Sequence, residues 1–292
     1  MTELRTQARA KINLCLFVGP VGGGRHQIVT LMDSLDVCDD VCLQLSPGAL
    51  RTDEVVCPGV EGPNLAADAL AAFRQRTGWD APPVRLQITK RVPVAGGMAG
   101  GSADAAAALR LAAEAADIDD LRLLENIAGE LGADVPSQIR GGLVLATGEG
   151  TRLRPIPLSL DYSVVVLPVD AELAARDVYA EADRLGVPRD ALGLARALTR
   201  VQAAISAETV LDHVHNDLQD PARSLCPAID EALEAAINAG ADSTLVSGSG
   251  PTVLALFFEV GHRERAATAH ATLLAEGRTP APLLAAPSGP ID

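Results

Sequence analysis

The first strongly patterned segment of the chain alternates between apolar and other positions. Between residues 9 and 18, every second position from Ala10 onward is apolar, and Lys11 and Asn13 lie between them. A period of two predicts a β-strand on which Lys11 and Asn13 share one face. Residues 19–24 contain four glycines and one proline, which predict a loop before a second apolar segment.

The rest of the pattern mixes helical and extended segments without a regular strand–helix–strand repeat. Residues 64–73 have helical periodicity, with Asn64 placed to cap the helix. Further helices are predicted near 102–116, 120–131, 172–185, 190–206, 221–239 and 262–276, and strands within 41–60, 142–147 (entered from 135–140), 162–167, 245–257 and near the C-terminal end. This mixture predicts an α+β fold.

A polar turn at residues 148–154, followed by prolines at 155 and 157, predicts a boundary in the chain. We therefore expect two units, 1–155 and 156–292.

A glycine-rich stretch dominates the first unit. Residues 90–106 are Lys-Arg-Val-Pro-Val-Ala-Gly-Gly-Met-Ala-Gly-Gly-Ser-Ala-Asp-Ala-Ala, and an alanine-rich helical pattern begins at Ser102. Glycines let the backbone approach a ligand closely, and the free N–H groups at a helix start favour an anion. The stretch predicts a phosphate site formed by backbone amides from Gly97 to Ala103. A plain turn between strand and helix is the alternative interpretation.

The common phosphate motifs do not account for this stretch. It contains no lysine directly before Ser102, as a P-loop would, and its glycines do not fit the dinucleotide-binding register. An oxidoreductase that binds NAD is therefore not favoured. Ser102 is predicted to cap the helix or to bind Mg²⁺, with the cap favoured by its position alone. Asp104 is predicted to complement the helix dipole from the first turn.

Composition and charge narrow the class of protein. The net charge of −14 over 292 residues argues against nucleic acid or an anionic membrane as a partner. Only Lys11 and Lys90 among the 24 cationic residues are lysines, so we expect lysine where a compact ammonium is needed. The chain has no unbroken apolar run of membrane-spanning length and no signal-like N-terminus. Five cysteines without a CxxC pair predict free thiols and a cytoplasmic protein, and the histidines form no zinc pattern with them.

Several motifs together resemble those of the GHMP kinase superfamily. They are Ala-Lys-Ile-Asn-Leu at 10–14, the glycine loop at 93–106, Gly-Ala-Asp-Val-Pro at 132–136 and Ser-Gly-Ser-Gly-Pro at 247–251. The whole set, with Asn-Leu at 64–65 and Asn-Asp-Leu at 216–218, is most similar to the family of 4-diphosphocytidyl-2-C-methyl-D-erythritol kinases. The resemblance covers nearly the whole chain, with the motifs in the same order.

This resemblance implies a fold and a reaction. The fold would be the two-domain GHMP kinase arrangement, with an ATP-binding N-terminal domain (1–155) like the second domain of ribosomal protein S5. The C-terminal domain (156–292) would be ferredoxin-like, and the active site would lie between the two. The reaction would phosphorylate the C2 hydroxyl of a cytidyl diphospho-sugar alcohol with ATP, and Mg²⁺ is expected. We expect small-molecule partners only, and a monomer or weak homodimer.

The resemblance also implies roles for individual residues. Asp134 matches the family's catalytic base and Lys11 its charge-stabilising lysine, while Asn13 matches a substrate-contacting amide. Ser102 is the one residue we would name as a metal ligand. The residues expected to bind ATP are Pro93, Val94, Ala95, Gly96, Gly97, Met98, Ala99, Gly100, Gly101, Ser102 and Ala103. Without the resemblance, Asp134 would be interpreted as a turn or capping aspartate and Lys11 as a solvated strand lysine.

The chain departs from the family at the predicted base-binding segment. The family usually has Asp-Gly-Tyr-His-Glu where this chain has Gly-Gly-Arg25-His26-Gln. The resemblance implies that Tyr179 lies on one face of the cytosine and that His26 pairs with its edge. Because a guanidinium plane can also stack on a base, we expect the cytosine between Arg25 and Tyr179. The alternatives are an exposed Arg25 with weaker base binding, or another alcohol substrate within the superfamily. A non-catalytic nucleotide-binding regulator is less consistent with the presence of both Lys11 and Asp134.

Overall fold

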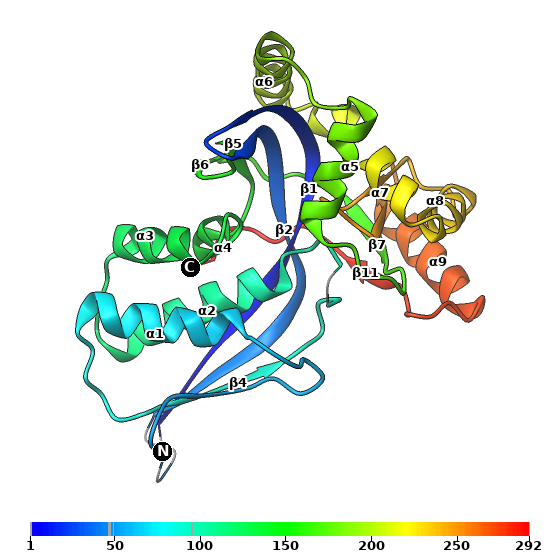
Figure 1. The fold of residues 1–292 in the computed structure, drawn as a ribbon. Helices are drawn as coiled ribbons and strands as arrows, with labels where there is room; N and C mark the ends of the chain where they lie inside the picture. The colour runs from blue at the N-terminus through cyan, green and yellow to red at the C-terminus, as the bar shows by residue number, and fades with distance from the viewer. Residues whose placement is uncertain (1, 46–47, 49, 95, 292) are drawn as a thin grey trace.

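The computed structural model describes residues 2–45, 48, 50–94 and 96–291, and its longest elements are two paired strands (Figure 1). Strands β1 (Thr2–Gly22) and β2 (Arg25–Leu45) form an antiparallel hairpin of 21 residues each. The expected loop at 19–24 is wrong in extent: a register shift between Val18 and Val21 accommodates the glycine and proline, and pairing continues to Gly22–Arg25. Only Gly23 and Gly24 form the turn, both with positive φ.

The hairpin is the centre of a seven-stranded sheet. The strand order is β3-β4-β2-β1-β8, and β5 joins β2 on a branch that β6 completes. The added strands are β3 (Glu54–Val56), β4 (Arg85–Thr89), β5 (Val144–Gly148), β6 (Arg152–Pro155) and β8 (His215–Asn216). Because β8 comes from the second half and pairs in parallel with β1, the sheet spans the expected boundary near residue 155.

Four helices of the first half pack together on this sheet (Figure 1). They are α1 (Leu65–Thr77), α2 (Gly100–Ala115), α3 (Leu121–Leu131) and α4 (Val135–Arg140). The side chain of Asn64 accepts a hydrogen bond from Ala66 N, which confirms the predicted cap. The alanine-rich α2 is buried along most of its length, where its small side chains allow close packing.

Two boundaries in this half differ from the sequence prediction. Helix α2 begins at Gly100 with Ala99 as its N-cap, so Ser102 lies inside the first turn and is not the cap. Residues 135–140 form the short helix α4, with Pro136 in its first turn, where a missing N–H costs nothing. A six-residue helix is too short for its period to be recognised beside the following strand.

The second half has its own four-stranded antiparallel sheet. Its order is β11-β7-β10-β9, and its strands are β7 (Ser163–Leu167), β9 (Ser243–Val246), β10 (Val253–Phe257) and β11 (Leu283–Ala285). The helical elements of this half are α5 (Ala175–Leu185), α6 (Ala191–Ala207), η1 (Val210–His213), α7 (Gln219–Leu225), α8 (Ala228–Asn238) and α9 (His262–Ala275). The single helix expected over 221–239 is wrong, because Pro227 lacks an N–H and separates α7 from α8.

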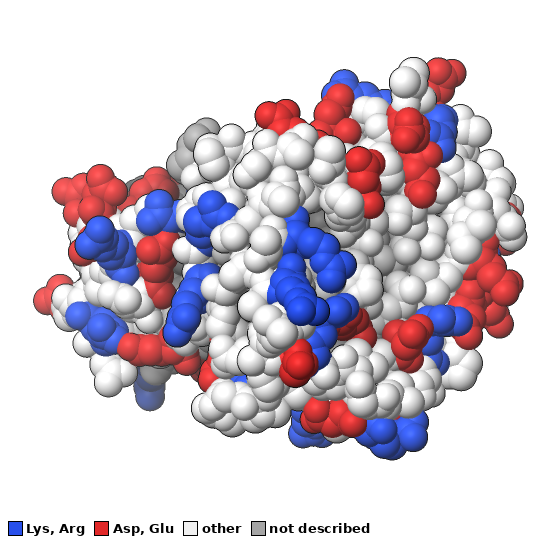
Figure 2. Space-filling model, turned by 90° about the horizontal axis from the view of Figure 1, so that it is seen from above, with Lys and Arg blue, Asp and Glu red and all other residues white. Residues whose placement is uncertain are grey.

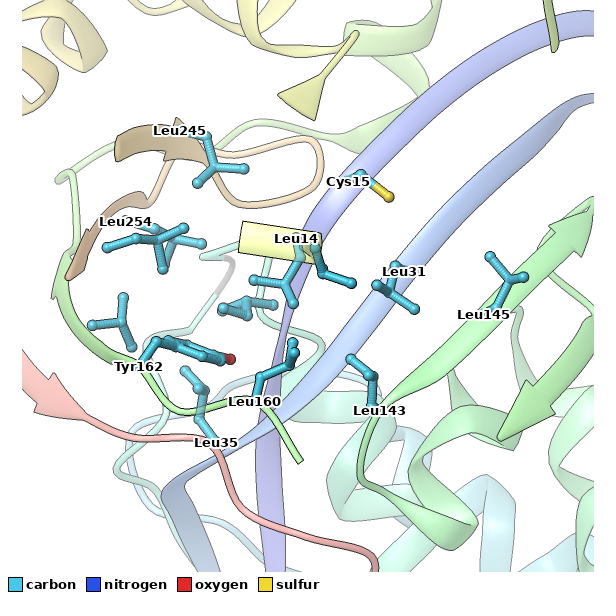
Figure 3. Close-up of a cluster of buried hydrophobic side chains, with 14 of the residues drawn as sticks. Leu14, Cys15, Leu31, Leu35, Leu143, Leu145, Leu160, Tyr162, Leu245 and Leu254 are labelled. Carbon is cyan, nitrogen blue, oxygen red and sulfur yellow. The ribbon is translucent and has the colours of Figure 1, made fainter. Parts of the chain in front are cut away.

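One hydrophobic cluster joins the two halves (Figure 3). Leu14 and Leu31 from the long hairpin pack in it with Leu254 of β10. The buried hydroxyl of Tyr162, just before β7, donates to Asp33 Oδ2 of β2 at 3.1 Å. The halves therefore share a core, which holds their facing surfaces in a defined relation.

Candidate active site

A cavity of about 520 Å³ lies where the two halves meet. The first half contributes β1, the glycine loop, the start of α2 and Asp134, and the second half contributes α5 and the glycine turn near Gly248. Lys11 and Lys90 are the cationic side chains among the described residues that line the cavity. Both lysines of the chain therefore lie at one site.

Lys11 is held in a polar network on β1. Its ammonium donates to Asn13 Oδ1 at 2.8 Å, and Asn13 Nδ2 donates to Thr30 Oγ1 at 2.7 Å. Lys11 is 6% exposed, so the solvated-strand-lysine interpretation is wrong. A buried ammonium requires anionic or polar partners, and a tethered one is pre-organised for a negatively charged ligand.

Asp134 lies between α3 and α4 with its carboxylate toward Lys11. Asp134 Oδ2 is 3.9 Å from Lys11 Nζ, and the Asp134 side chain is 47% exposed. Within the described part of the chain, Asp134 occupies the N-cap position of α4 but its side chain makes no capping hydrogen bond. The capping interpretation is therefore wrong, and the carboxylate is available to the cavity.

The glycine loop is packed tightly against the second half. Ser247 Oγ donates to Gly97 O at 3.1 Å, and Lys11 N donates to Met98 O at 3.1 Å. A Cβ on Gly97 would collide with the Ser247 carbonyl oxygen, so only glycine fits there. The loop is thus clamped between β1 and the turn at Gly248 with its path fixed.

The residues expected to bind ATP fall into two groups, those with buried side chains and those that line the cavity. Met98 and Ala103 are 1% exposed and point into the core, whereas most of the others line the cavity. Those that line it are Pro93, Val94, Gly96, Gly97, Ala99, Gly100, Gly101 and Ser102, and Ala95 lies outside the described residues. The backbone of Met98 nevertheless helps to hold the loop against β1, because its carbonyl oxygen accepts the hydrogen bond from Lys11 N.

Asp104 does not have the dipole role expected from the sequence. Because α2 begins at Gly100, Asp104 lies in the second turn, where it is 3% exposed and 2.7 Å from Lys90 Nζ. Burial raises the pKa of Asp104 to about 6, and the Lys90 ammonium opposes this shift. The scarcity of lysine was the signal in the sequence that pointed to Lys90, but no pattern identified its carboxylate partners.

His26 and Tyr179 come together from the two halves. Their rings are stacked with centroids 5.4 Å apart and an interplanar angle of 18°. His26 Nδ1 lies 2.8 Å from Gly19 O, and His26 Nε2 lies 3.3 Å from Asp183 Oδ2. Tyr179 lines the cavity, and burial, with a smaller effect of Asp134, raises its pKa to about 12.

Arg25 lies apart from this group. It is exposed at the tip of the β1–β2 hairpin, and neither Arg25 nor His26 is among the described residues that line the cavity. The structure therefore brings together Lys11, Asn13, Asp134, Tyr179 and most of the glycine loop, with His26 behind Tyr179.

The sequence did not predict the structural role of the Asn216 side chain. Its Nδ2 donates to Val246 O at 2.8 Å and Gly248 O at 2.7 Å, and its Oδ1 accepts from Leu218 N at 2.9 Å. Asn216 thus fixes the glycine turn that borders the cavity.

The charged side chains are not distributed evenly over the surface. Figure 2 shows Lys and Arg side chains gathered near the middle of one face, with Asp and Glu around them.

Comparison with known proteins agrees with this architecture. The model of the GHMP kinases N terminal domain matches residues 64–142, and that of the GHMP kinases C terminal domain matches residues 193–276. The chain is thus a GHMP kinase, an ATP-dependent enzyme that phosphorylates a small molecule, and the expected α+β GHMP fold is confirmed.

Individual relatives define the family within that class. The chain is 39% identical to the 4-diphosphocytidyl-2-C-methyl-D-erythritol kinase of Thermobifida fusca, covering 93% of this chain and 92% of that one. It is 37% identical to the same kinase of a Nocardioides species, over 98% and 97% of the two chains. The chain belongs to the family of 4-diphosphocytidyl-2-C-methyl-D-erythritol kinases.

Solved structures support the same assignment. A crystal structure of 4-(cytidine 5'-diphospho)-2C-methyl-D-erythritol kinase matches with a TM-score of 0.75 and 28% identity, covering 98% of this chain and all of that one. Homoserine kinase from Cytophaga hutchinsonii matches with a TM-score of 0.64 at 18% identity, which shows the shared fold alone. Among the described helices, none is long and apolar enough to cross a membrane.

Proposed function

We propose that this kinase transfers the γ-phosphoryl group of ATP to the C2 hydroxyl of 4-diphosphocytidyl-2-C-methyl-D-erythritol. The products would be the 2-phosphate and ADP, in non-mevalonate isoprenoid precursor biosynthesis. The observation that carries the proposal is the Lys11–Asp134 pair, 3.9 Å apart, in a cavity bordered by the glycine loop. The names of the relatives supply the substrate.

Asp134 and Lys11 have different proposed roles in the reaction. Asp134 accepts the C2 hydroxyl proton while the hydroxyl oxygen attacks the γ-phosphorus, and the bond to the β–γ bridging oxygen breaks to release ADP. Lys11 stabilises the negative charge that develops on the transferring group. Asn13 holds the Lys11 ammonium by a 2.8 Å hydrogen bond, and we propose that its amide also contacts the substrate.

The glycine loop is proposed to bind the phosphates of ATP through backbone N–H groups. The first turn of α2, from Gly100, supplies free N–H groups at the cavity wall. Mg²⁺ commonly binds phosphate oxygens, waters and one or two protein oxygens, so it needs few protein ligands. The described residues contain no cluster of three metal-ligating side chains, and the Ser102 hydroxyl at the cavity fits such a sparse site. When bound, Mg²⁺ neutralises charge on the β and γ phosphates.

The cytosine is proposed to stack on Tyr179. Tyr179 lines the cavity, and His26, whose ring is stacked on Tyr179 with centroids 5.4 Å apart, is proposed to bind the edge of the base. Arg25, exposed at the hairpin tip, is proposed to cover the second face of the base. In this proposal, both halves bind the base: Arg25 and His26 come from the first half and Tyr179 from the second.

We further propose that residues 1–155 and 156–292 are the two domains and that the protein is a monomer or weak homodimer. The four-stranded sheet, built only from strands of residues 156–292, supports the division, although β8 of the same half pairs with β1 in the other sheet. The shared core around Leu14 and Leu254 suggests limited movement between them.

A coupled ADP-release assay tests the proposed substrate. The panel contains the cytidyl methylerythritol substrate, mevalonate and homoserine, each with ATP and Mg²⁺. We expect kcat/KM for the cytidyl substrate to exceed the others by about 10³ or more, since a buried polar site rejects analogues that leave its groups unpaired. Greater turnover of mevalonate or homoserine would instead assign the chain to another GHMP-type small-molecule kinase.

A further inference from the structure

Three side chains form a buried network directly beneath the glycine loop. Lys90 Nζ is 2.5 Å from Asp39 Oδ2 and 2.7 Å from Asp104 Oδ2. The exposed fractions of the Lys90, Asp39 and Asp104 side chains are 13%, 0% and 4%. The network connects β2, the end of β4 and helix α2, and the proposed reaction gives it no task.

Asp39 also holds the backbone that leads into the loop. Its Oδ1 accepts hydrogen bonds from Arg91 N at 2.5 Å and from Val92 N at 2.8 Å. The β2–β4 ladder ends with the pair Asp40–Thr89, so these two N–H groups lie beyond the last ladder pair. A carboxylate that accepts two backbone donors replaces the missing strand partner.

The far end of the loop is tied to the same ammonium. Asp104 follows the loop on α2, and a Cβ on Gly100 would lie 3.2 Å from Lys90 Nζ, so the ammonium contacts the first turn of α2. A cation near a helix N-terminus is unfavourable by itself, and the two carboxylates offset that cost. Both ends of the loop, at Val92 and Asp104, are therefore fixed relative to one buried ammonium.

We propose that Asp39 and Lys90 are positioning residues for ATP, which set the loop in the conformation whose backbone N–H groups receive the phosphates. Asp39 is fully buried and is not among the described residues that line the cavity, so it acts through Lys90 and the loop backbone. Lys90 in addition balances the charge of Asp104 near the phosphate site. The inference rests on the proposed role of the loop in ATP binding.

Direct titration of the full-length protein with ATP and Mg²⁺ tests this inference. The variants are Lys90→Met and Asp39→Asn, which preserve side-chain volume. The control is Asp53→Asn, because Asp53 likewise binds a cationic side chain (Arg74, 2.6 Å) and a backbone N–H (Val84, 2.9 Å) but does not line the cavity. Calorimetry gives Kd for ATP, thermal unfolding gives Tm, and steady-state kinetics give KM for the alcohol.

We expect Kd for ATP to rise about tenfold or more in Lys90→Met and Asp39→Asn, with KM for the alcohol within about twofold of wild type. Asp53→Asn should lower Tm and leave Kd for ATP unchanged. If Lys90→Met does not fold, Asp39→Asn alone decides the question. A Kd within about twofold of wild type in a folded Asp39→Asn protein, with a Tm loss like that of the control, would overturn the proposal. The ATP titration needs no alcohol, so failure of the proposed alcohol substrate in the ADP-release assay is distinguishable.

Discussion

Lys11 Nζ and Asp134 Oδ2 lie 3.9 Å apart, although the two residues come from the first strand and from the junction of α3 and α4. The distance is longer than a good hydrogen bond, and Lys11 instead donates to Asn13 Oδ1. Asp134 is therefore paired in charge with Lys11, and its side chain remains 47% exposed at the cavity, as the proposed role of a base requires.

Replacing the proposed base should affect turnover far more than ATP binding. We expect Asp134→Asn to reduce kcat by about 10²–10⁴, because an amide does not accept the hydroxyl proton. Kd for ATP, measured by calorimetry, should change little, since the glycine loop is intact. Asp119→Asn is the control, because Asp119 is exposed and does not line the cavity. Near-normal turnover of Asp134→Asn would falsify the base role.

Removing the ammonium of Lys11 should impair the chemical step. Lys11→Met keeps the length of the side chain at a position that is 6% exposed, so we expect a folded protein. The expected loss in kcat is about 10²–10³, as for other groups that stabilise developing charge. Single-turnover kinetics should locate the loss in phosphoryl transfer. The prediction is contradicted if only product release slows.

If Tyr179 binds the cytosine, its replacement should change KM for the cytidyl substrate but not KM for ATP. Tyr179→Ala should raise KM for the cytidyl substrate by about tenfold, since stacking on one ring contributes roughly 1–3 kcal/mol per base. KM for ATP should remain close to wild type. Arg25→Ala should give a smaller increase, because Arg25 is exposed. An unchanged kcat/KM for Arg25→Ala would remove Arg25 from the site.

The glycine loop offers a pair of matched alanine substitutions. Gly97→Ala introduces a Cβ that collides with the Ser247 carbonyl at a position with φ of 70°, whereas a Cβ on Gly101 meets nothing within 4 Å. We expect Gly97→Ala to displace the loop and weaken ATP binding by about tenfold or more, since strain at such a position costs on the order of 1–3 kcal/mol. Gly101→Ala should preserve the fold and Tm. Equal Tm and Kd for the Gly97→Ala variant and wild type would show that the loop path is not constrained.

The buried contact between Asp33 and Tyr162 should make stability depend on pH. Burial raises the pKa of Asp33 to about 7 from its ordinary value of 3.8. A raised carboxyl pKa means that the folded state favours the protonated acid, so this contribution to stability is complete below about pH 4 and is lost as the pH rises through 7.

Urea unfolding of wild type and Asp33→Asn at several pH values measures this effect. Between pH 5 and 8, the free energy of unfolding of wild type should fall relative to Asp33→Asn by roughly 2–4 kcal/mol. Tyr162→Phe removes the hydrogen bond that lowers the pKa of Asp33, so it should extend the loss to higher pH. Parallel pH profiles for wild type and Asp33→Asn would contradict the prediction.

Local patterns were sufficient where one short segment carries the information. The alternation at 9–18 correctly predicted a strand that carries Lys11 and Asn13, and Asn64 correctly predicted a helix cap. The alternation did not predict that Lys11 and Asn13 are buried. The motifs, taken in order, correctly predicted the GHMP kinase family. Local patterns failed at element ends, such as the start of α2 and the division between α7 and α8, where one residue changes the boundary.

Spatial relations between distant segments were decided only by the tertiary structure. The sequence determined which residues carry charge, which backbone segments are glycine-rich and which family they match. Folding decided that Asp104 pairs with Lys90 rather than with the helix dipole, that Arg25 is exposed, and that His26 stacks on Tyr179. The physical reason is that burial and pairing depend on which chain segments pack together, and a buried ammonium such as Lys90 requires carboxylates that lie 51 and 14 residues away.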